Sequence, residues 1–552
     1  MSEQSAMTSF VRTITVARGV FAPGHLGELT QYLPFELVDD VLARSRAVQG
    51  RLRLLPSRVG VYFVLALAVF PAVGYLGVWG KLVAGLGPLA PVRPCEKALR
   101  DLRRRIGAAP LKMLFETVAG PIAQPRTPGV CYRKWRTVAF DGCSSLRAPD
   151  QPRVRAWLGK ILNAGYGPEG YPHLRLMALC ETGTRGLLGA VFGPTNKGET
   201  HYARRLLPLL NDTMLLLADR AFAGNDFLID TADTGAQLLV RLNSRRRPTV
   251  FTALPDGSFL TQLQDRTFRI INVDITATCD DGTRISDHYM LITTLLDHRT
   301  DPAERLARLY HERWVVESAF LALRHTLLTG RVLRSCDACG LEQELWAWLT
   351  VHQVLRRAMC DAAESRPGTD PDRASFTIAL QAPADQIVDA CGITGDDSDG
   401  GGIARAVLAG LLPARRPRIS ARKVKCPMSR YGTTQNETRP LSSHSFNRLD
   451  ITVLAATEQP TALPPSPANT DRRSHVFRLL VAADPGQDWT PRQIADALKI
   501  DHIRSLSAQM GQWITQKFLI RSGHGRYRLH PQWVKTPQPP AGSRDSTAAI
   551  PA

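Results

Sequence analysis

The sequence predicts an α/β protein: an all-helical N-terminal domain, a mixed core that carries a β-rich insertion, and a small C-terminal helical module. Three observations support this class. Apolar residues recur at three- and four-residue steps over much of the first 125 residues. Residues 137–218 then follow the order strand, strand, strand, helix, strand. Two hairpin patterns, each turning at an Asp-Gly pair, occupy the stretch at about 235–300.

The charge balance indicates the class of partner. The chain has 552 residues, enough for about two to four domains with sizeable cores. It carries 69 Lys plus Arg against 50 Asp plus Glu, a formal net charge of +19. Such an excess favours a polyanion, either nucleic acid or an anionic membrane surface. Ten cysteines follow no regular framework and no secretory signal opens the chain, so we expect a cytoplasmic protein.

Residues 1–125 form the expected helical domain, a candidate DNA-binding domain. The run from Val59 to Gly80 is uncharged and long enough to span a membrane. Pro71 interrupts it, and its glycines weaken a continuous helix. We therefore expect two buried helices that meet near Pro71, and no membrane partner.

Residues 126–430 form the expected α/β domain, and two aspartates stand at its strand ends. Thr137 to Asp141 is a short strand, although Asp141 and Gly142 are also a common turn pair. Residues 213–218 are continuously apolar, which is typical of a strand buried on both faces. Asp219 follows this strand directly, where it is also a favoured helix N-cap.

A third carboxylate lies on an amphipathic helix expected over residues 306–327. Its apolar residues fall within one arc, and a second stripe contains Tyr310, Arg313, Glu317 and Arg324. Glu317 is half sheltered there, which suits a metal ligand; the alternative is an ordinary solvated helix edge. Carboxylates that converge from separate elements are what hard divalent cations require.

The β-rich insertion is basic. Its arginines suggest a clamp on a phosphate backbone; they are Arg241, Arg245, Arg246, Arg247, Arg266 and Arg269. Residues 415–430 add seven cationic side chains, which fit a phosphate contact and a solvated basic surface equally well.

Residues 431–473 are rich in Ser, Thr and Pro and are expected to be a linker. Residues 474–535 follow with helix, helix, helix and a basic hairpin, which is the winged-helix arrangement. Arg504 on the third helix and Arg526 on the hairpin are its expected DNA contacts. A protein-docking role for this module remains the alternative. We expect residues 536–552 to be a disordered tail.

These motifs together resemble the DDE transposases of the bacterial insertion-sequence 4 family. The resemblance rests on VAFDG around Asp141, LLLADRAF around Asp219, and Y-x2-R-x3-E ending at Glu317, and it covers roughly residues 25–430. The family places a lysine seven residues after the glutamate. This chain has Arg324 there, which keeps the charge but differs in phosphate geometry.

The resemblance implies a ribonuclease-H-like core in which Asp141, Asp219 and Glu317 hold two Mg²⁺ ions, with Mn²⁺ able to substitute. One ion would activate water or a DNA 3′-hydroxyl, and the other would stabilise the leaving oxygen. The strand-end phosphates would be positioned by Tyr310, Arg313 and Arg324. Trp314 would stack on a displaced base, unless it is an ordinary core residue.

The expected function is therefore cut-and-paste transposition of an insertion sequence. The chain would act as a homodimer or larger assembly on double-stranded DNA, at the element's terminal inverted repeats and at target DNA, in the nucleoid. Two alternatives remain: a metal-dependent nuclease that does not join strands, and a DNA-binding regulator whose core is inactive.

Overall fold

The computed structural model describes residues 24–51, 53–86, 91–159, 170–243, 246–279, 282–311, 313, 331–390, 401–413, 418–420, 443–455, 476, 479–480, 487–498, 503–515, 519–523 and 525–529. The chain divides into two compact units, residues 1–456 and 457–552.

The first unit begins with a group of helices: η1 (Leu29–Gln31), α1 (Phe35–Arg44), α2 (Ser57–Val69), α3 (Tyr75–Val83), η2 (Ala84–Leu86), α4 (Glu96–Ile106) and α5 (Ala109–Val118). Every residue of α2 except Arg58 is buried. The helix ends before Pro71, because the residue that precedes a proline is disfavoured in the helical region. The prediction of two helices meeting near Pro71 is confirmed. Among the described residues, no helix has the length and apolar content needed to cross a membrane.

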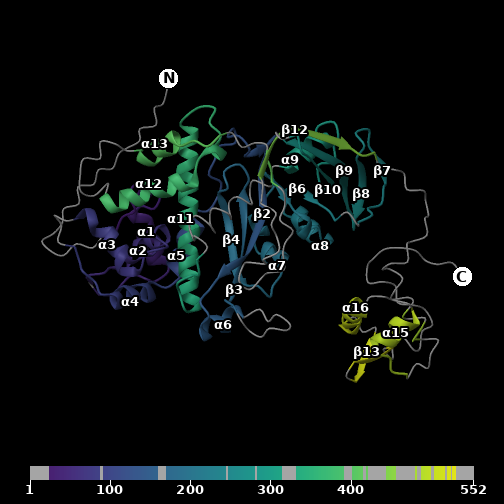
Figure 1. The fold of residues 1–552 in the computed structure, drawn as a ribbon, viewed down its shortest axis with the longest axis horizontal. Helices are drawn as coiled ribbons and strands as arrows, with labels where there is room; N and C mark the ends of the chain where they lie inside the picture. Colours follow the sequence, from purple (N-terminus) through teal and green to yellow (C-terminus); the bar gives the residue numbers. More distant parts are fainter. Residues whose placement is uncertain are drawn as a thin grey trace. The chain divides into compact units, whose positions relative to one another are not determined.

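A long helix connects these helices to the sheet. α11 (Ala338–Glu364) begins at an N-cap, Asp337, whose side chain accepts a hydrogen bond from the Gly340 amide, and it is buried along most of its length. Figure 1 shows α11 between the N-terminal helices and the strands, with α12 (Phe376–Asp389) and α13 (Gly402–Ala409) beside it. One continuous apolar core contains side chains from the early helices, from α11 and from one face of the sheet.

The sheet is mixed, and its strands lie in the order β11-β12-β9-β10-β6-β5-β2-β3-β4. β2, β5 and β6 are parallel to one another, whereas β2, β3 and β4 are antiparallel. The strands are β1 (Cys131–Tyr132), β2 (Trp135–Arg147), β3 (His173–Glu181), β4 (Leu187–Pro194), β5 (Met214–Ala218), β6 (Gln237–Arg241), β7 (Thr252–Ala253), β8 (Phe259–Leu263), β9 (Arg266–Cys279), β10 (Arg284–Thr293), β11 (Arg418–Ser420) and β12 (Ser443–Val453).

Both faces of the sheet are covered. The short elements around it are α6 (Pro152–Leu158), α7 (Glu199–Arg204), η3 (Leu207–Leu209), η4 (Arg220–Phe222), α8 (Asn225–Asp233), α9 (Ala303–His311) and η6 (Pro371–Arg373). Along β5, Leu215 and Leu217 enter the core shared with α9 and α11, while Leu216 and Ala218 enter a second core with α7 and α8. The prediction of a strand buried on both faces is therefore confirmed.

Two expectations about strands are wrong. Asp141 does not end its strand or begin a turn, because β2 continues to Arg147. The linker expected at 431–473 is wrong over 443–453, which forms β12 and pairs with β9. Its Ser and Thr content concealed the alternation of Leu449, Ile451 and Val453, which pack against the main core.

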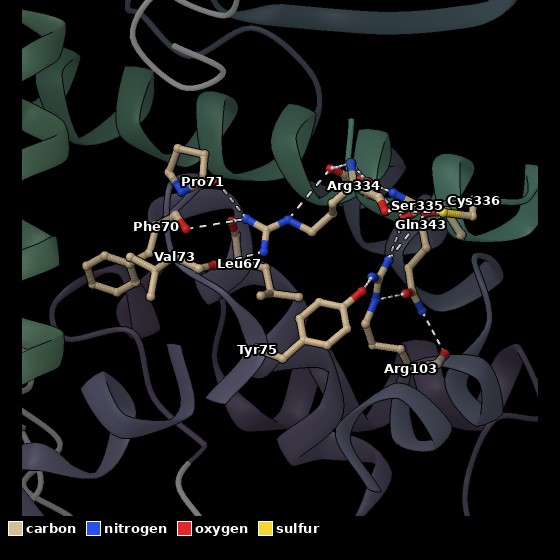
Figure 2. A network of polar contacts seen from close by, with 12 residues as sticks. Leu67, Phe70, Pro71, Val73, Tyr75, Arg103, Arg334, Ser335, Cys336 and Gln343 are labelled. Atoms are coloured by element: carbon tan, nitrogen blue, oxygen red, sulfur yellow. Dashed lines mark hydrogen bonds and ion pairs between the residues drawn. The ribbon is translucent and has the colours of Figure 1, made fainter. Parts of the chain in front are cut away.

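A buried polar network joins the N-terminal helices to the entry of α11 (Figure 2). The Arg103 guanidinium donates to Gln343 Oε1 at 2.9 Å, to Ser335 Oγ at 3.0 Å and to the Tyr75 hydroxyl. The Glu344 carboxylate accepts bonds from the amides of Arg334 and Ser335 and from the Ser335 hydroxyl. The network satisfies charges that would otherwise be costly to bury.

The second unit is small. The described residues include α15 (Pro491–Ala497), α16 (Ile503–Thr515) and a hairpin of β13 (Leu519–Gly523) and β14 (Arg526–Leu529), around a core of their own. α15 begins with a capping box, a motif readable from the sequence: the Thr490 side chain accepts from the Gln493 amide, and the Gln493 side chain accepts from the Thr490 amide. The predicted tail, 536–552, lies outside the described residues.

Candidate active site

Asp141 lies in β2, and Asp219 directly follows β5, the parallel neighbour of β2. The pairing of β2 with β5 matches Val138 to Leu216 and Ala139 to Leu217. The paired residues end there; continued by two residues along both segments, this register sets Asp141 opposite Asp219. Neighbouring strands are about 4.8 Å apart, so this pairing brings together two carboxylates separated by 77 residues of sequence.

Both side chains belong to the face that α9 covers. Successive residues of a strand alternate between faces, and Ala139 and Leu217 both belong to the core on the α9 side. The Cys180 thiol, buried on this face, has its pKa raised by burial first and by the negative charge of Asp141 second. The two aspartates therefore project from the same face.

Asp219 also caps a short helix. Its backbone is extended, with φ −85° and ψ 176°, and its Oδ1 accepts a hydrogen bond of 2.7 Å from the Ala221 amide at the start of η4. The N-cap interpretation is confirmed. The cap uses one carboxylate oxygen, so it does not exclude a second role for the other oxygen.

Tyr310, near the end of α9, supports the strand that leads to Asp219. The side chain is buried, and its hydroxyl donates a 3.1 Å hydrogen bond to the carbonyl of Ala218. Burial raises the pKa of Tyr310 to about 12, and the charge of Asp219 contributes in the same direction. In this structure the hydroxyl is directed at the protein backbone.

Arg241 extends the row of polar residues to a third strand. Ala218 pairs with Val240, so the register of β5 with β6 sets Asp219 opposite Arg241. The Arg241 guanidinium lies 4.1 Å from the Tyr289 ring centroid and donates to Asp287. Tyr289 in turn makes an edge contact with the Tyr310 ring. In the sequence, Arg241 is one of the arginines of the basic insertion. Its position beside Asp219 was missed, because the register between β5 and β6 cannot be inferred from the local sequence.

The remaining residues of the motif helix are only partly described. Arg313 is buried, and its amide donates to the Tyr310 carbonyl. Trp314, Glu317 and Arg324 lie outside the described residues. Within the part of the chain that the structure describes, no group of three or more His, Cys, Asp or Glu is arranged to hold a metal ion.

The insertion does not present all of its arginines to solvent. Arg269 is fully buried and pairs with Asp256, and it also donates to the carbonyl of Asp301 at 2.7 Å. Arg266 pairs with Asp233. The expectation that Arg269 faces a phosphate backbone is therefore wrong: its guanidinium holds the insertion to the loop before α9.

The expected contacts of the C-terminal module lie in the second unit. Arg504 is the second residue of α16, and Arg526 is exposed at the start of β14.

Comparisons with known proteins identify the family. Residues 23–116 match the model of the insertion element 4 transposase N-terminal domain, and residues 136–353 match the transposase DDE domain. The second match includes all three predicted carboxylates.

Two curated relatives come from Escherichia coli strain K12. The transposase InsG of insertion sequence element IS4 is 26% identical over 361 residues, which are 64% of this chain and 80% of InsG. The candidate transposase InsZ is 29% identical over 206 residues, 37% of this chain and 67% of InsZ. A solved piggyBac transposase synaptic complex with hairpin DNA overlaps 71% of this chain and 85% of its own, with 9% identity and a TM-score of 0.35. At this TM-score and identity, the structural similarity carries no conclusion about function.

The chain belongs to the insertion-sequence 4 family of DDE transposases, which are metal-dependent enzymes that cleave DNA.

Proposed function

We propose that the chain excises and integrates an insertion sequence by phosphoryl transfer at its terminal inverted repeats. The observation that carries this proposal is the register that sets Asp141 and Asp219 side by side on the face covered by α9. α9 (Ala303–His311) covers only the first part of the helix expected over 306–327, and Glu317 lies beyond it, outside the described residues. Three acidic residues from three elements are assigned to one site.

The strand order supports a ribonuclease-H-like core. β4, β3, β2, β5 and β6 lie side by side in that order, with the first three antiparallel and the last two parallel to β2. β2 and β5, the first and fourth of these five strands in chain order, therefore lie next to each other within the sheet. The two aspartates come from these strands.

The residues fit a divalent metal. Carboxylate oxygens are the donors that Mg²⁺ and Mn²⁺ prefer, and Asp219 keeps one oxygen beyond its cap. We assign Asp141, Asp219 and Glu317 as the ligands of two Mg²⁺ ions, with Mn²⁺ as a substitute. The ions would supply Lewis-acid chemistry, increasing the acidity of a nucleophilic hydroxyl and neutralising charge at phosphorus.

The reaction has two balanced steps. In cleavage, a water oxygen attacks a phosphodiester at the element's end and the bond from phosphorus to the 3′ oxygen breaks, which leaves a 3′-hydroxyl and a 5′-phosphate. In joining, that 3′-hydroxyl attacks a target phosphodiester, so one phosphodiester forms as another breaks. Arg313 and Arg324 would bind the phosphates, and Trp314 would stack on a displaced base. Tyr310 would act through Asp219, since its hydroxyl is bonded to Ala218.

Recognition of the ends would involve other parts of the chain. We assign α16 of the C-terminal module to a DNA groove and the hairpin arginine Arg526 to a phosphate, as in a winged helix. Two ends must be brought together for excision, so we propose that a homodimer assembles on the DNA.

The direct test combines purified protein, Mg²⁺ and a duplex that carries the element's end. Asp141→Asn, Asp219→Asn and Glu317→Gln should each abolish end cleavage and strand joining while duplex affinity is retained. Asparagine is also a good N-cap, so Asp219→Asn removes the charge without removing the cap to Ala221. Asp226→Asn, an exposed carboxylate in the first turn of α8, is the matched control and should remain active.

The products distinguish the alternatives. Cleaved ends that never join to target DNA would identify a nuclease, and specific binding without cleavage would identify a regulator. Unchanged cleavage in any one of the three carboxylate variants would remove that residue from the site.

A further inference from the structure

A pocket of about 490 Å³ opens beside the junction of the N-terminal helices and α11. It is lined by residues 71–74 of the loop between α2 and α3, by Arg147, Arg331 and Arg334, and by Glu344 and Trp348. Its volume lies within the range of pockets that hold small ligands or part of a larger one. Neither the family motifs nor the carboxylate site accounts for it.

The lining is strongly cationic, with three guanidiniums against one carboxylate. Arg147 and Arg331 are exposed, and they come from distant parts of the chain: the end of β2 and the segment before α11. The backbone brings these segments together, because the Leu333 amide donates to the Arg147 carbonyl at 2.8 Å. Guanidinium groups bind phosphates with two parallel hydrogen bonds.

The other two charged residues of the pocket form its wall. Arg334 donates to the carbonyls of Pro71 and Val73, each at 2.9 Å, as Figure 2 shows. The Glu344 carboxylate accepts hydrogen bonds from the Ser335 amide and hydroxyl. The Arg334 Nε lies 3.9 Å from Glu344 Oε1, so the guanidinium offsets the negative charge of this carboxylate.

We propose that Arg147 and Arg331 bind phosphodiester groups of the DNA strand that enters the active site, and that the pocket holds part of the DNA sugar-phosphate backbone. This inference rests on the proposed function. It adds a DNA-contact surface that neither the motif helix nor the C-terminal module provides.

The position of the pocket fits this role. Arg147 and Asp141 belong to the same strand, and six residues of extended chain span at most about 20 Å. Trp348 belongs to the core on the same face of the sheet as Ala139 and Leu217. A DNA strand rises about 3.4 Å per nucleotide. The phosphates in the pocket should therefore lie within about six nucleotides of the cleaved bond.

The experiment measures affinity for an end duplex as a function of salt concentration. The double variant Arg147→Gln/Arg331→Gln should bind more weakly, and the slope of log affinity against log salt should fall by about 0.9 for each phosphate that the variant no longer neutralises. Both side chains are exposed, and Arg147 lies 5.9 Å from the Tyr171 ring centroid. Thermal unfolding should therefore change by no more than a surface substitution causes, about 0.5 kcal/mol per residue. The matched control is Arg204→Gln/Arg366→Gln, which removes the same charge from two exposed arginines, one in α7 and one just after α11. It should keep the wild-type slope.

A second measurement locates the contact. Single methylphosphonate substitutions, which neutralise one phosphate each, should weaken wild-type binding at a position within about six nucleotides of the cleavage site. The same substitution should have no effect on the Arg147→Gln/Arg331→Gln protein.

The outcomes separate this inference from the proposed function. Wild-type protein that fails to cleave the end duplex with Mg²⁺ would count against the function. Wild-type protein that cleaves, beside a double variant with unchanged slope and unchanged methylphosphonate profile, would overturn the pocket inference alone. A double variant that loses mononucleotide binding but keeps the DNA slope would assign the pocket to a free nucleotide and also overturn it.

Discussion

At the scale of single residues, Tyr310 shows how a side chain can serve the site without facing the substrate. Family resemblance implied a contact with DNA phosphate, yet the hydroxyl is bonded to the carbonyl of Ala218, the residue before Asp219. Burial keeps this phenol neutral. The Tyr310 hydroxyl therefore remains a hydrogen-bond donor at every pH well below 12.

Tyr310→Phe tests this positioning role. Loss of the hydroxyl leaves a buried carbonyl without its donor, so the free energy of unfolding should fall by about 1 kcal/mol. Looser placement of Asp219 should lower the cleavage rate at saturating DNA by about tenfold, equivalent to about 1.4 kcal/mol in the barrier, with duplex affinity unchanged. Tyr202→Phe is the control, because it removes a buried hydroxyl that donates to the carbonyl of Pro194 on the other face of the sheet; the cleavage rate should be unchanged. Weakened affinity with a normal saturated rate would instead assign Tyr310 to a phosphate.

His352 couples stability to pH. It is fully buried in α11, where desolvation holds its pKa well below its ordinary 6.5. As pH falls below 6.5, the unfolded chain takes up a proton that the folded protein refuses, so the free energy of unfolding falls. Between pH 7.5 and 5.5 this single group should remove about 1.4 kcal/mol.

His352→Gln should therefore lose about 1.4 kcal/mol less stability than wild type over that interval, measured by urea unfolding at both pH values. Phe376→Leu alters the ring that packs against His352 and should lower stability equally at both. An unchanged pH dependence in His352→Gln would show that the histidine titrates normally in the folded protein.

At the scale of elements, local patterns predicted several elements well, including the long β9–β10 hairpin. They missed the full length of β2 and the existence of β12. The apolar run of β5 and the capping box of α15 are local signals, and both are found in the structure. β2 extends beyond Asp141 because pairing with β3 on one side overrides the turn preference of Asp-Gly. β12 was missed because its partner, β9, lies about 170 residues earlier in the chain.

The sequence could predict which residues are candidates for the site, but not how they are arranged in space. The strand context identified Asp141 and Asp219 as candidates, but their adjacency depends on the register of parallel strands joined by long crossovers. Register comes from packing of the whole sheet, not from either strand alone. For the same reason the sequence could not place Arg241 beside Asp219, or Tyr310 against Ala218.

The C-terminal module gives a prediction at this scale. Arg504→Gln and Arg526→Gln should each weaken binding to the end duplex and reduce the salt slope by about 0.9. Arg492→Gln, an exposed arginine of α15, should leave both quantities unchanged if α16 and the hairpin form the contact surface. Unaltered affinity and slope in the Arg504 and Arg526 variants would favour a protein-docking role.

At the scale of the whole molecule, α11 packs against both the N-terminal helices and the sheet of the first unit, within one continuous core. Residues 331–337 lead into α11 directly after the stretch that carries Glu317 and Arg324. The polar network around Arg103 fixes that entry, so stability of the helical region and geometry of the catalytic region should be coupled.

Arg103→Met breaks this network while preserving much of the packing of the side chain. The variant leaves Gln343 Oε1 and the Gly340 carbonyl buried without their donor, and the free energy of unfolding should fall by about 3 kcal/mol. Arg104→Met, at the exposed neighbouring position on α4, should change it by less than about 0.5 kcal/mol. Urea unfolding followed by tryptophan fluorescence measures both, since Trp346 and Trp348 lie in α11. Equal, small effects of the two substitutions would show that apolar packing alone holds α11 against the N-terminal helices.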